Sequence, residues 1–327
     1  MIDWHDSKGW SRPVISPLHN FNMHPAAKCL HYSCQLFEGT KAFRGVDGKI
    51  RTFRLEMNIN RMQASAVRSY FPTFDAQELI KCIDQLIKLD DKWVFPADTE
   101  TSLYIRPSMI GDEGTLGVSA SNSGKLFVLL GPVGSSFKAG QGTPAVSLLA
   151  NPQYVRAWPG GTGDSKLGSN YGPTIFVQKV AESQGLQQVL WLFGEEHLLT
   201  EAGTMNIFAV FKTPSGKKEL VTPPLGDGLI LPGVTRDCIV NLAKEWEDVE
   251  MVERNIPMKD IQTAVANNTL LEFFGAGTAC VISPVKRIHF KGEDIVIPTG
   301  GELSQRILKT LSDIQYGRTL HPWSREV

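Results

Sequence analysis

Hydrophobic residues recur at helical spacing in two segments of the chain. The first segment opens with Asp75 and Glu78, which are spaced as a capping box at the start of a helix. The apolar positions after them predict an amphipathic helix whose buried face is formed by Leu79, Ile80, Ile83, Leu86 and Ile87. The second segment ends at Gly317 and predicts a last amphipathic helix that buries Leu303, Ile307, Leu308, Leu311 and Ile314.

Runs of β-branched and aromatic residues predict strands between these helices. In the first part of the chain such runs cover residues 101–110 and 125–130, on either side of a turn-rich stretch. Further strands are expected at residues 145–150, 188–193 and 205–211. The pattern therefore mixes helices and strands, and it predicts an α/β protein of the α+β kind.

Two more helices are indicated by their end signals. Residues 173–185 begin with proline and end with glycine, as helices often do. Another helix is expected after Pro232 and Gly233, with a buried side made of Ile239, Leu242, Ala243 and Trp246.

The composition changes between these two groups of elements. Residues 134–144 are rich in Gly, Ser, Lys and Gln, which favours an exposed connector. A chain of 327 residues that is 42% hydrophobic is also long enough for two cores. We therefore predict a small α/β domain over residues 1–134, a connector over 135–144 and a large domain over 145–327.

The charge balance restricts the partners. The chain has 33 Lys and Arg against 34 Asp and Glu, so it has no overall field to attract nucleic acid or an anionic membrane. Charges, Gly or Pro interrupt every apolar run before it reaches the roughly 20 residues of a membrane span. Small molecules and other subunits are the expected partners.

The start of the chain and its cysteines bear on its compartment. The first ten residues have neither the apolar core of a secretion signal nor the Arg-rich pattern of an import peptide. The five cysteines form no C-x-x-C pair and the seven histidines show no paired-ligand spacing, so we expect no metal. A cytoplasmic location is expected, with the mitochondrial matrix as the alternative if an import segment precedes this sequence.

A glycine-rich loop at residues 160–173 holds a single lysine, Lys166. The loop fits neither the P-loop nor the dinucleotide-binding pattern. A loop lysine is usually a solvated surface charge, and it becomes a nucleophile only where the protein removes it from water.

This loop, together with residues 199–208, resembles the branched-chain-amino-acid aminotransferases, a family with the class IV pyridoxal-phosphate fold. Residues 31–39, 60–62, 102–107, 231–236 and 275–280 resemble further blocks of that family in the same order. The resemblance extends from about Trp4 to Gly317 and is greatest to the animal enzymes. It implies a small N-terminal α/β domain and a larger C-terminal domain, with pyridoxal 5'-phosphate between them and a homodimeric assembly.

The resemblance also assigns cofactor residues. Lys166 matches the lysine that carries the cofactor as a Schiff base and then moves a proton between Cα and the cofactor. Glu201 matches the partner of the pyridine nitrogen, and Tyr171 matches the tyrosine beside the phenolic oxygen. The phosphate would be bound by Arg61, by the amides of Val234 and Thr235 at a helix start, and by Thr204 and Thr278. Without the resemblance, each side chain would more often be an ordinary surface or packing residue.

Substrate contacts follow from the same resemblance. Tyr32, Thr278 and Ala279 would bind the α-carboxylate, and Phe37, Tyr104 and Tyr171 would line the side-chain pocket. Val118 is expected as a lid from a neighbouring subunit. Arg106, beside Tyr104, is our candidate for the distal carboxylate of 2-oxoglutarate. Because one methylene is worth only ~1–3 kcal/mol in such a pocket, L-leucine, L-isoleucine and L-valine should all be accepted.

The predicted activity is thus reversible ping-pong amino transfer from these amino acids to 2-oxoglutarate. A D-amino-acid aminotransferase or an aminodeoxychorismate lyase of the same fold is the alternative, and a non-catalytic binding protein is a remote one. The sequence departs from the vertebrate pattern at Cys280 and Ser283, where a C-x-x-C pair would stand, so thiol-disulfide regulation is expected to be absent. Phe137 lies one position later than the aromatic residue of the animal enzymes and would have to replace it.

Overall fold

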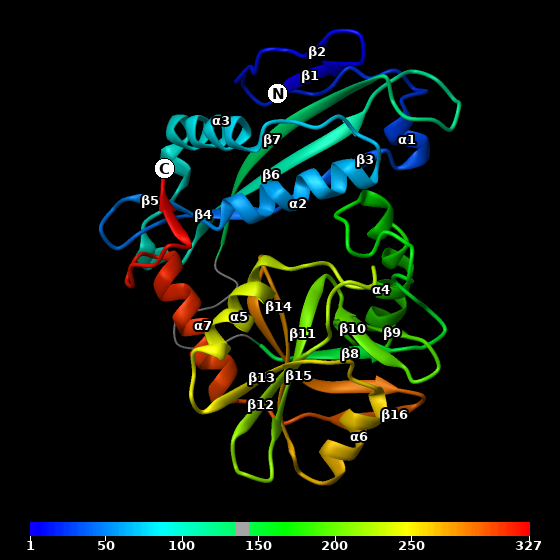
Figure 1. Ribbon diagram of the computed structural model, residues 1–327, viewed down its shortest axis with the longest axis vertical. Helices are drawn as coiled ribbons and strands as arrows, with labels where there is room; N and C mark the ends of the chain where they lie inside the picture. The colour runs from blue at the N-terminus through cyan, green and yellow to red at the C-terminus, as the bar shows by residue number, and fades with distance from the viewer. Residues whose placement is uncertain (135–143) are drawn as a thin grey trace. The chain divides into compact units, whose positions relative to one another are not determined.

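The protein is described by a computed structural model that covers residues 1–134 and 144–327. These residues form two compact units (Figure 1). The first unit contains residues 1–134, Ser165–Tyr171 and Asp313–Val327, and the second contains residues 144–164 and Gly172–Ser312. The chain therefore leaves the second unit after Asp164, contributes one loop to the first unit and returns at Gly172.

The first unit is built on an eight-stranded sheet with the order β17-β5-β4-β6-β7-β1-β2, in which β3 pairs with β6. The two longest strands, β6 and β7, are antiparallel and stay in register from Ser102 opposite Val133 to Gly111 opposite Gly124. The bounds are β1 (Ile2–His5), β2 (Gly9–Trp10), β3 (Gln35–Phe37), β4 (Thr40–Arg44), β5 (Ile50–Phe53), β6 (Ser102–Gly111), β7 (Ser123–Val133) and β17 (Ser324–Glu326).

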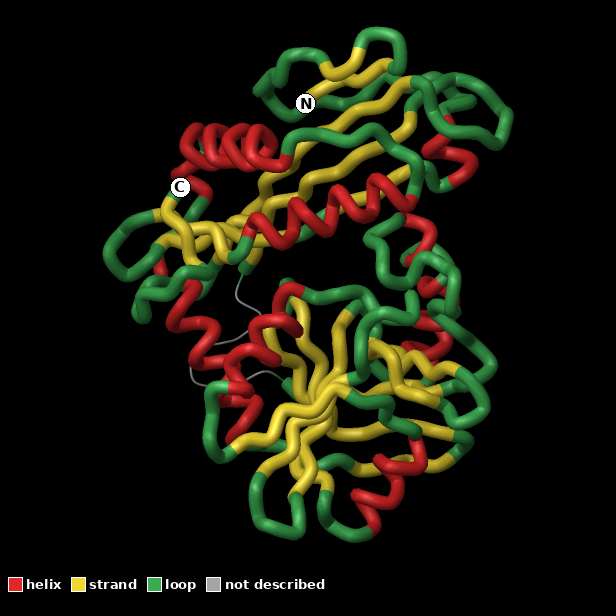
Figure 2. Tube along the Cα trace, in the orientation of Figure 1, coloured by secondary structure: helices red, strands yellow, loops and turns green. Residues whose placement is uncertain are grey.

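Two long helices, α2 (Leu55–Arg68) and α3 (Ala76–Leu89), cover one face of this sheet (Figures 1 and 2). Each helix buries one apolar stripe, as an amphipathic surface helix must. The core between helices and sheet contains Leu55, Ile59, Met62, Ile83 and Ile87 from the helices and Leu36, Leu103, Ile105 and Met109 from the strands. A short helix, α1 (Lys28–Tyr32), precedes β3.

The second unit is a nine-stranded sheet that closes on itself. Its order is β10-β9-β8-β15-β14-β11-β12-β13, and the ninth strand, β16, pairs with β15. An additional pairing of β10 with β11 joins the two ends of the first six strands. The bounds are β8 (Val146–Ala150), β9 (Gln188–Phe193), β10 (Leu198–Ala202), β11 (Met205–Lys212), β12 (Lys218–Thr222), β13 (Val249–Glu253), β14 (Leu270–Gly277), β15 (Val281–Phe290) and β16 (Glu293–Val296).

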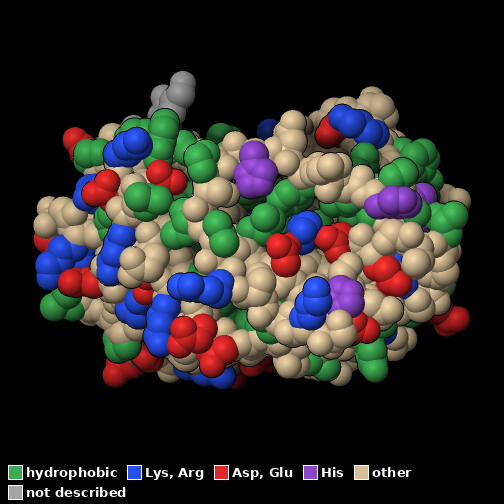
Figure 3. Space-filling model, turned by 90° about the horizontal axis from the view of Figure 1, so that it is seen from above, with side chains coloured by type: hydrophobic (Ala, Val, Ile, Leu, Met, Phe, Trp, Pro, Cys, Tyr) green, Lys and Arg blue, Asp and Glu red, His purple; other side chains and the backbone are tan. Residues whose placement is uncertain are grey.

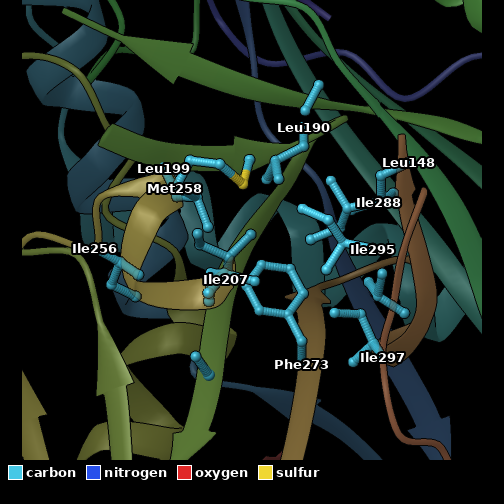
Figure 4. Packing of buried hydrophobic residues seen from close by; sticks show 14 of the residues in the cluster. Leu148, Leu190, Leu199, Ile207, Ile256, Met258, Phe273, Ile288, Ile295 and Ile297 are labelled. Carbon is cyan, nitrogen blue, oxygen red and sulfur yellow. The ribbon is translucent and has the colours of Figure 1, made fainter. Parts of the chain in front are cut away.

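Apolar side chains from these strands and one helix fill the interior of the second unit. Figure 4 shows Ile207 and Phe273 from neighbouring strands beside Ile288, Ile295 and Ile297. Closure of the sheet leaves few free edges, which limits pairing with other chains. The helices are α4 (Thr174–Ser183), α5 (Val234–Lys244), α6 (Met258–Ala266) and α7 (Glu302–Gln315), the last of which passes from the second unit into the first.

The mixed helix and strand content confirms the predicted fold class. The predicted helix after Asp75 is α3, and the Asp75 carboxylate caps it by accepting bonds from the amides of Gln77 at 2.8 Å and Glu78 at 3.0 Å. Three predicted core residues differ, and one of them is Leu308, which is only half-buried on α7. Leu86 is only half-buried on α3, and Trp246 lies beyond the end of α5, where the guanidinium of Arg306 covers its ring at 3.8 Å.

The compact units do not follow the contiguous scheme that we predicted, 1–134 and 145–327. Leu167 forms a β-bridge with Leu36, and β17 pairs with β5, so both later segments make their contacts in the first unit. Most of the predicted connector, residues 135–144, and the predicted role of Phe137 lie outside the described residues.

The surface charge, the helices and the cysteines each bear on what the protein can bind. Figure 3 shows acidic and basic side chains interleaved on the face that it draws. No helix in the described ranges is long and apolar enough to span a membrane. Within residues 1–134 and 144–327, no group of His, Cys, Asp and Glu is arranged as a metal site. The five cysteines, all within the described ranges, are not joined in disulfides, and Ser283 lies in β15 after Cys280.

Candidate active site

The loop that carries Lys166 is attached to the first unit by its backbone. The amide of Lys166 donates to the hydroxyl of Ser65 on α2 at 2.8 Å, and its carbonyl accepts from the amide of Phe37 at 3.2 Å. The side chain of Asn170 then donates to the carbonyl of Ser165 at 2.7 Å and closes the loop. A glycine-rich segment is thereby held in one position.

The Lys166 amine lies among aromatic groups. Its Nζ donates to the Tyr171 hydroxyl at 3.1 Å and stands 4.8 Å from the centre of the Phe37 ring. The rings of Phe37 and Tyr171 are 4.9 Å apart at 58°, so they form a continuous apolar wall. Lys166 is half-buried. The structure thus brings together three of the predicted site residues.

Arg61 is held by a carboxylate that the sequence analysis did not identify. Glu38 is fully buried at 0% exposure and accepts from Arg61 Nε at 2.7 Å and from Nη2 at 2.9 Å. Asn58, one turn before Arg61 on α2, donates to the same carboxylate at 2.9 Å. Asn58, Arg61 and Ser65 share one face of α2 because of their helical spacing. That face carries the polar contacts of the site.

Tyr104 and Arg106 lie on the same face of β6, since they are two residues apart in a strand. Arg106 Nη2 donates to the Tyr104 hydroxyl at 2.8 Å, and its guanidinium lies over the Phe37 ring at 4.6 Å. Gly39 leaves room for this arrangement, because a Cβ there would lie 2.1 Å from the Tyr104 oxygen. Tyr104 and Arg106 therefore extend the aromatic wall that begins at Phe37 and Tyr171.

The described contacts of Tyr32 and Val118 are with residues other than those around Lys166. The hydroxyl of Tyr32 donates to the carbonyl of Leu116 in the loop between β6 and β7. Val118 lies in the same loop, and its exposure is 83%. The structure thus connects Tyr32 with the predicted lid loop, and no described contact joins either residue to Lys166.

In the second unit, Glu201 is a buried carboxylate at 2% exposure. One oxygen accepts from the amide of Leu231 at 2.8 Å, and the other pairs with Nε of Arg156 at 3.2 Å. Arg156 itself is anchored by the carbonyls of Leu229 at 3.1 Å and Gly163 at 3.2 Å. A buried carboxylate needs such a cation and donors to remain charged.

Asn206 lies opposite Glu201 in the β10–β11 ladder, and it also binds the backbone of Leu231. Its Nδ2 donates to the carbonyl of Leu231 at 2.9 Å. Gly233 is required nearby, because a Cβ there would lie 1.9 Å from Asn206 Oδ1. Helix α5 starts immediately afterwards at Val234 and Thr235, and its N-cap residue Gly233 has no side chain to cap the first amides. The start of α5 has the geometry of an anion site.

Three residues that were predicted to contact the cofactor or the substrate lie in turns of the second unit. Thr204 is exposed in the turn between β10 and β11. Thr278 and Ala279 lie in the turn between β14 and β15, which is followed by Val281 with a positive φ of 56°. The described contacts do not test the roles of these three residues, which stay predictions.

The residues that the sequence analysis missed are the partners that hold the candidates in place: Glu38, Asn58, Ser65, Arg156 and Asn206. Each bond spans a long stretch of chain, so no local spacing indicates it. The exception is the spacing of Asn58, Arg61 and Ser65, which places them on one helical face and could have indicated a polar stripe.

Comparisons with known proteins agree with this geometry. The chain matches the family described as Amino-transferase class IV over residues 35–288. It is 51% identical over 329 residues to the cytosolic branched-chain-amino-acid aminotransferase of Mus musculus, covering 100% of the chain and 84% of that protein. It is 49% identical over 330 residues to the mitochondrial enzyme of Rattus norvegicus, covering 100% and 83%.

Solved structures show the same fold at lower identity. The branched-chain amino acid aminotransferase of Escherichia coli superposes with a TM-score of 0.78 at 23% identity, covering 99% of this chain and 98% of that one. The enzyme of Thermobaculum terrenum, solved in its PLP form, gives a TM-score of 0.77 at 20% identity, with 99% and 97% covered.

Proposed function

Because the chain belongs to the amino-transferase class IV family, we propose that it transfers the amino group of L-leucine, L-isoleucine or L-valine to 2-oxoglutarate. Support for these substrates comes from relatives that are about half identical along the whole chain and are branched-chain-amino-acid aminotransferases. The observation that carries the chemistry is the Lys166 amine, which lies 3.1 Å from a phenol in an aromatic wall.

The side chains present fit pyridoxal 5'-phosphate. This cofactor supplies, when bound, an aldehyde that reacts with amines and a ring that withdraws electrons from the substrate's Cα. Lys166 would hold the aldehyde end, and Glu201 would face the ring nitrogen. Arg61 and the amides of Val234 and Thr235 would bind the phosphate, with Thr204 and Thr278 as further contacts. The donor set thus contains an amine, a buried carboxylate, a fixed guanidinium and a helix start.

Lys166 has two tasks in this proposal. Its amine would hold the aldehyde end of the cofactor, and as a free amine it would take the proton from the substrate's Cα. Tyr171 accepts a hydrogen bond from Nζ and so restrains where the amine points. The rings of Phe37 and Tyr171 exclude water from one side of the amine. An amine that is held by a directional hydrogen bond needs little reorientation for proton transfer.

Glu201 supplies a negative charge that stays in one place. Its salt bridge to Arg156 and its bond from the Leu231 amide fix both oxygens. Glu38 fixes the position of Arg61 in the same way. A guanidinium with two short carboxylate bonds has little freedom to rotate. The Glu201–Arg156 and Glu38–Arg61 ion pairs therefore fix these charges before a ligand binds.

The substrate wall supports apolar side chains over other classes. Phe37, Tyr104 and Tyr171 would contact the branched side chain, and Tyr32 with Thr278 and Ala279 would bind the α-carboxylate. Arg106 would pair with the distal carboxylate of 2-oxoglutarate in the second half-reaction. Its bond to Tyr104 leaves the guanidinium beside the same wall, so one pocket could serve both substrates.

We further propose a cytosolic homodimer in which Val118 covers the site of the neighbouring subunit. The exposed side chain of Val118 is consistent with such a contact. Light scattering of the purified protein would test the dimer, and fractionation of cells would test the compartment.

The test of the activity uses purified protein loaded with the cofactor. We expect L-leucine and 2-oxoglutarate to give glutamate, and D-alanine to give none. Borohydride reduction followed by peptide mapping should place the pyridoxyl group on Lys166, and Lys166→Ala should lose both activity and label. An adduct on another lysine, or turnover with D-alanine but not L-leucine, would overturn the proposal.

A further inference from the structure

Lys28 is a fully buried lysine outside the groups described above. It lies at the start of α1, is 0% exposed, and its side chain is 1% exposed. Lysine is almost never fully buried unless its ammonium group is paired, because removal of the charge from water is costly. The contacts of this ammonium group therefore indicate what the residue does.

Every described contact of the Lys28 ammonium group goes to one segment, residues 113–120. Nζ pairs with Glu113 Oε2 at 2.9 Å, and it donates to the Ser119 hydroxyl at 2.5 Å and to the carbonyl of Ala120 at 2.8 Å. A longer bond reaches the Ser119 carbonyl at 3.3 Å. The amide of Lys28 also donates to the Glu113 carbonyl at 3.2 Å. One side chain thus holds both ends of the segment.

Residues at both ends of α1 are attached to the same segment. Ala27 forms a β-bridge with Gly114, and the Tyr32 hydroxyl donates to the carbonyl of Leu116. Leu116 and Val118, with exposures of 65% and 83%, are the large apolar side chains that the segment presents to solvent. Movement of the segment would therefore remove the acceptor of Tyr32 and shift both apolar side chains.

We propose that Lys28 is a positioning residue that fastens segment 113–120 to α1 and thereby sets the affinity for the amino-acid substrate. This inference rests on the proposed function, in which Tyr32 binds the α-carboxylate and Val118 acts as a lid. An apolar side chain could fill the same space, so packing alone does not require an ammonium group. What the ammonium group adds is a set of directional bonds to one segment.

The test compares Lys28→Met with the double variant Lys28→Met/Glu113→Gln. The single variant leaves the Glu113 carboxylate without its cation and should lower stability, and the double variant should recover part of that loss. Both lack the bonds to Ser119 and Ala120. In both, we expect hydrogen exchange of the amides of residues 114–120 to rise about tenfold, because local opening becomes easier.

Kinetics then separate positioning from general stability. We expect the KM for L-leucine to rise about fivefold in both variants while kcat stays within about twofold, as for a lost binding contact. Lys218→Met is the matched control, because Lys218 is also paired, to Glu302 at 3.1 Å, but lies on β12 in the second unit. It should change neither the exchange of this segment nor the KM.

Three outcomes would overturn the inference. They are unchanged exchange in both variants, recovery of the KM together with the stability in the double variant, and a fall in kcat at constant KM. If the unmodified protein had no activity with L-leucine, the proposed function would fail instead. The exchange experiment would then still decide whether Lys28 fastens the segment.

Discussion

The carboxylate of Glu38 and the guanidinium of Arg61 form a two-pronged ion pair, with bonds of 2.7 Å and 2.9 Å, inside the first unit. Glu38 also accepts from Asn58 and from the amide of Gly39. Every described bond of this carboxylate therefore serves to fix Arg61 and the turn after β3.

Glu38→Gln should destabilise the protein by about 3–5 kcal/mol, because it leaves the Arg61 guanidinium buried without its counter-charge. Urea unfolding of the purified variant would measure the loss. Glu78→Gln is the control, since Glu78 pairs with Lys81 at the surface and its removal should cost less than about 1 kcal/mol. Equal effects of the two substitutions would contradict the role of the buried pair.

Tyr171→Phe removes the hydrogen bond to Lys166 but keeps the ring that packs on Phe37. We expect kcat to fall about tenfold to a hundredfold, because the bond that orients the amine is lost, with little change in stability. Steady-state kinetics with L-leucine and a thermal melt would check both. Tyr154→Phe, a tyrosine that packs on Phe176 in the second unit, should leave kcat unchanged.

Arg106→Gln tests the assignment of the distal carboxylate. The half-reaction with 2-oxoglutarate should lose about 1.5–3 kcal/mol of transition-state binding, because a charged partner of that carboxylate is gone. The half-reaction with L-leucine should keep its rate. Single-turnover measurements of each half separate the two, and an equal loss in both would show that Arg106 is only structural.

Gly39→Ala should disturb Tyr104 and Arg106 without replacing either residue. The new Cβ would lie 2.1 Å from the Tyr104 oxygen, so the ring must move, at an expected cost of about 1–3 kcal/mol. The KM for 2-oxoglutarate should rise as Arg106 follows. Gly131→Ala is matched, because Gly131 lies opposite Tyr104 in the β6–β7 ladder and a Cβ there meets nothing within 4 Å. A rise in KM with both variants would argue against a specific clash.

Tyr316 makes the stability depend on alkaline pH. Burial raises the pKa of its phenol from 10.0 to about 12, so the folded protein keeps a proton that the unfolded chain loses. The stabilisation is complete below pH 10 and declines as the pH rises through 12. Denaturant unfolding across this window should show a steeper decline for the unmodified protein than for Tyr316→Phe. Parallel declines would mean that other groups dominate.

Features that depend on local spacing could be predicted from the sequence. Asp75 caps α3 and Ile83 lies in its buried face, since capping and periodicity act within a few residues. Lys166 was located by resemblance, and the structure then placed Tyr171 and Phe37 beside it. Without the resemblance, a lysine in a glycine-rich loop would have remained one surface charge among many.

Features that depend on distant partners could not be predicted. The pair of Glu38 with Arg61 and that of Glu201 with Arg156 each join segments far apart in the chain, and a single sequence has no spacing rule for such contacts. Trp246 was misplaced for a related reason. Its apolar spacing matched α5, but the helix ends at Lys244 and the ring is covered by Arg306 from α7.

The route of the chain through Ser165–Tyr171 limits how the protein can be divided. Leu167 packs in the core of the first unit against residues from α2 and the sheet, and Val327 packs against the same core. A gene fragment ending at residue 134 would encode neither side chain and would leave β5 without its neighbour β17. Expression of the two halves separately should therefore give incomplete folds, whereas grafting both later segments onto the first would restore its missing contacts.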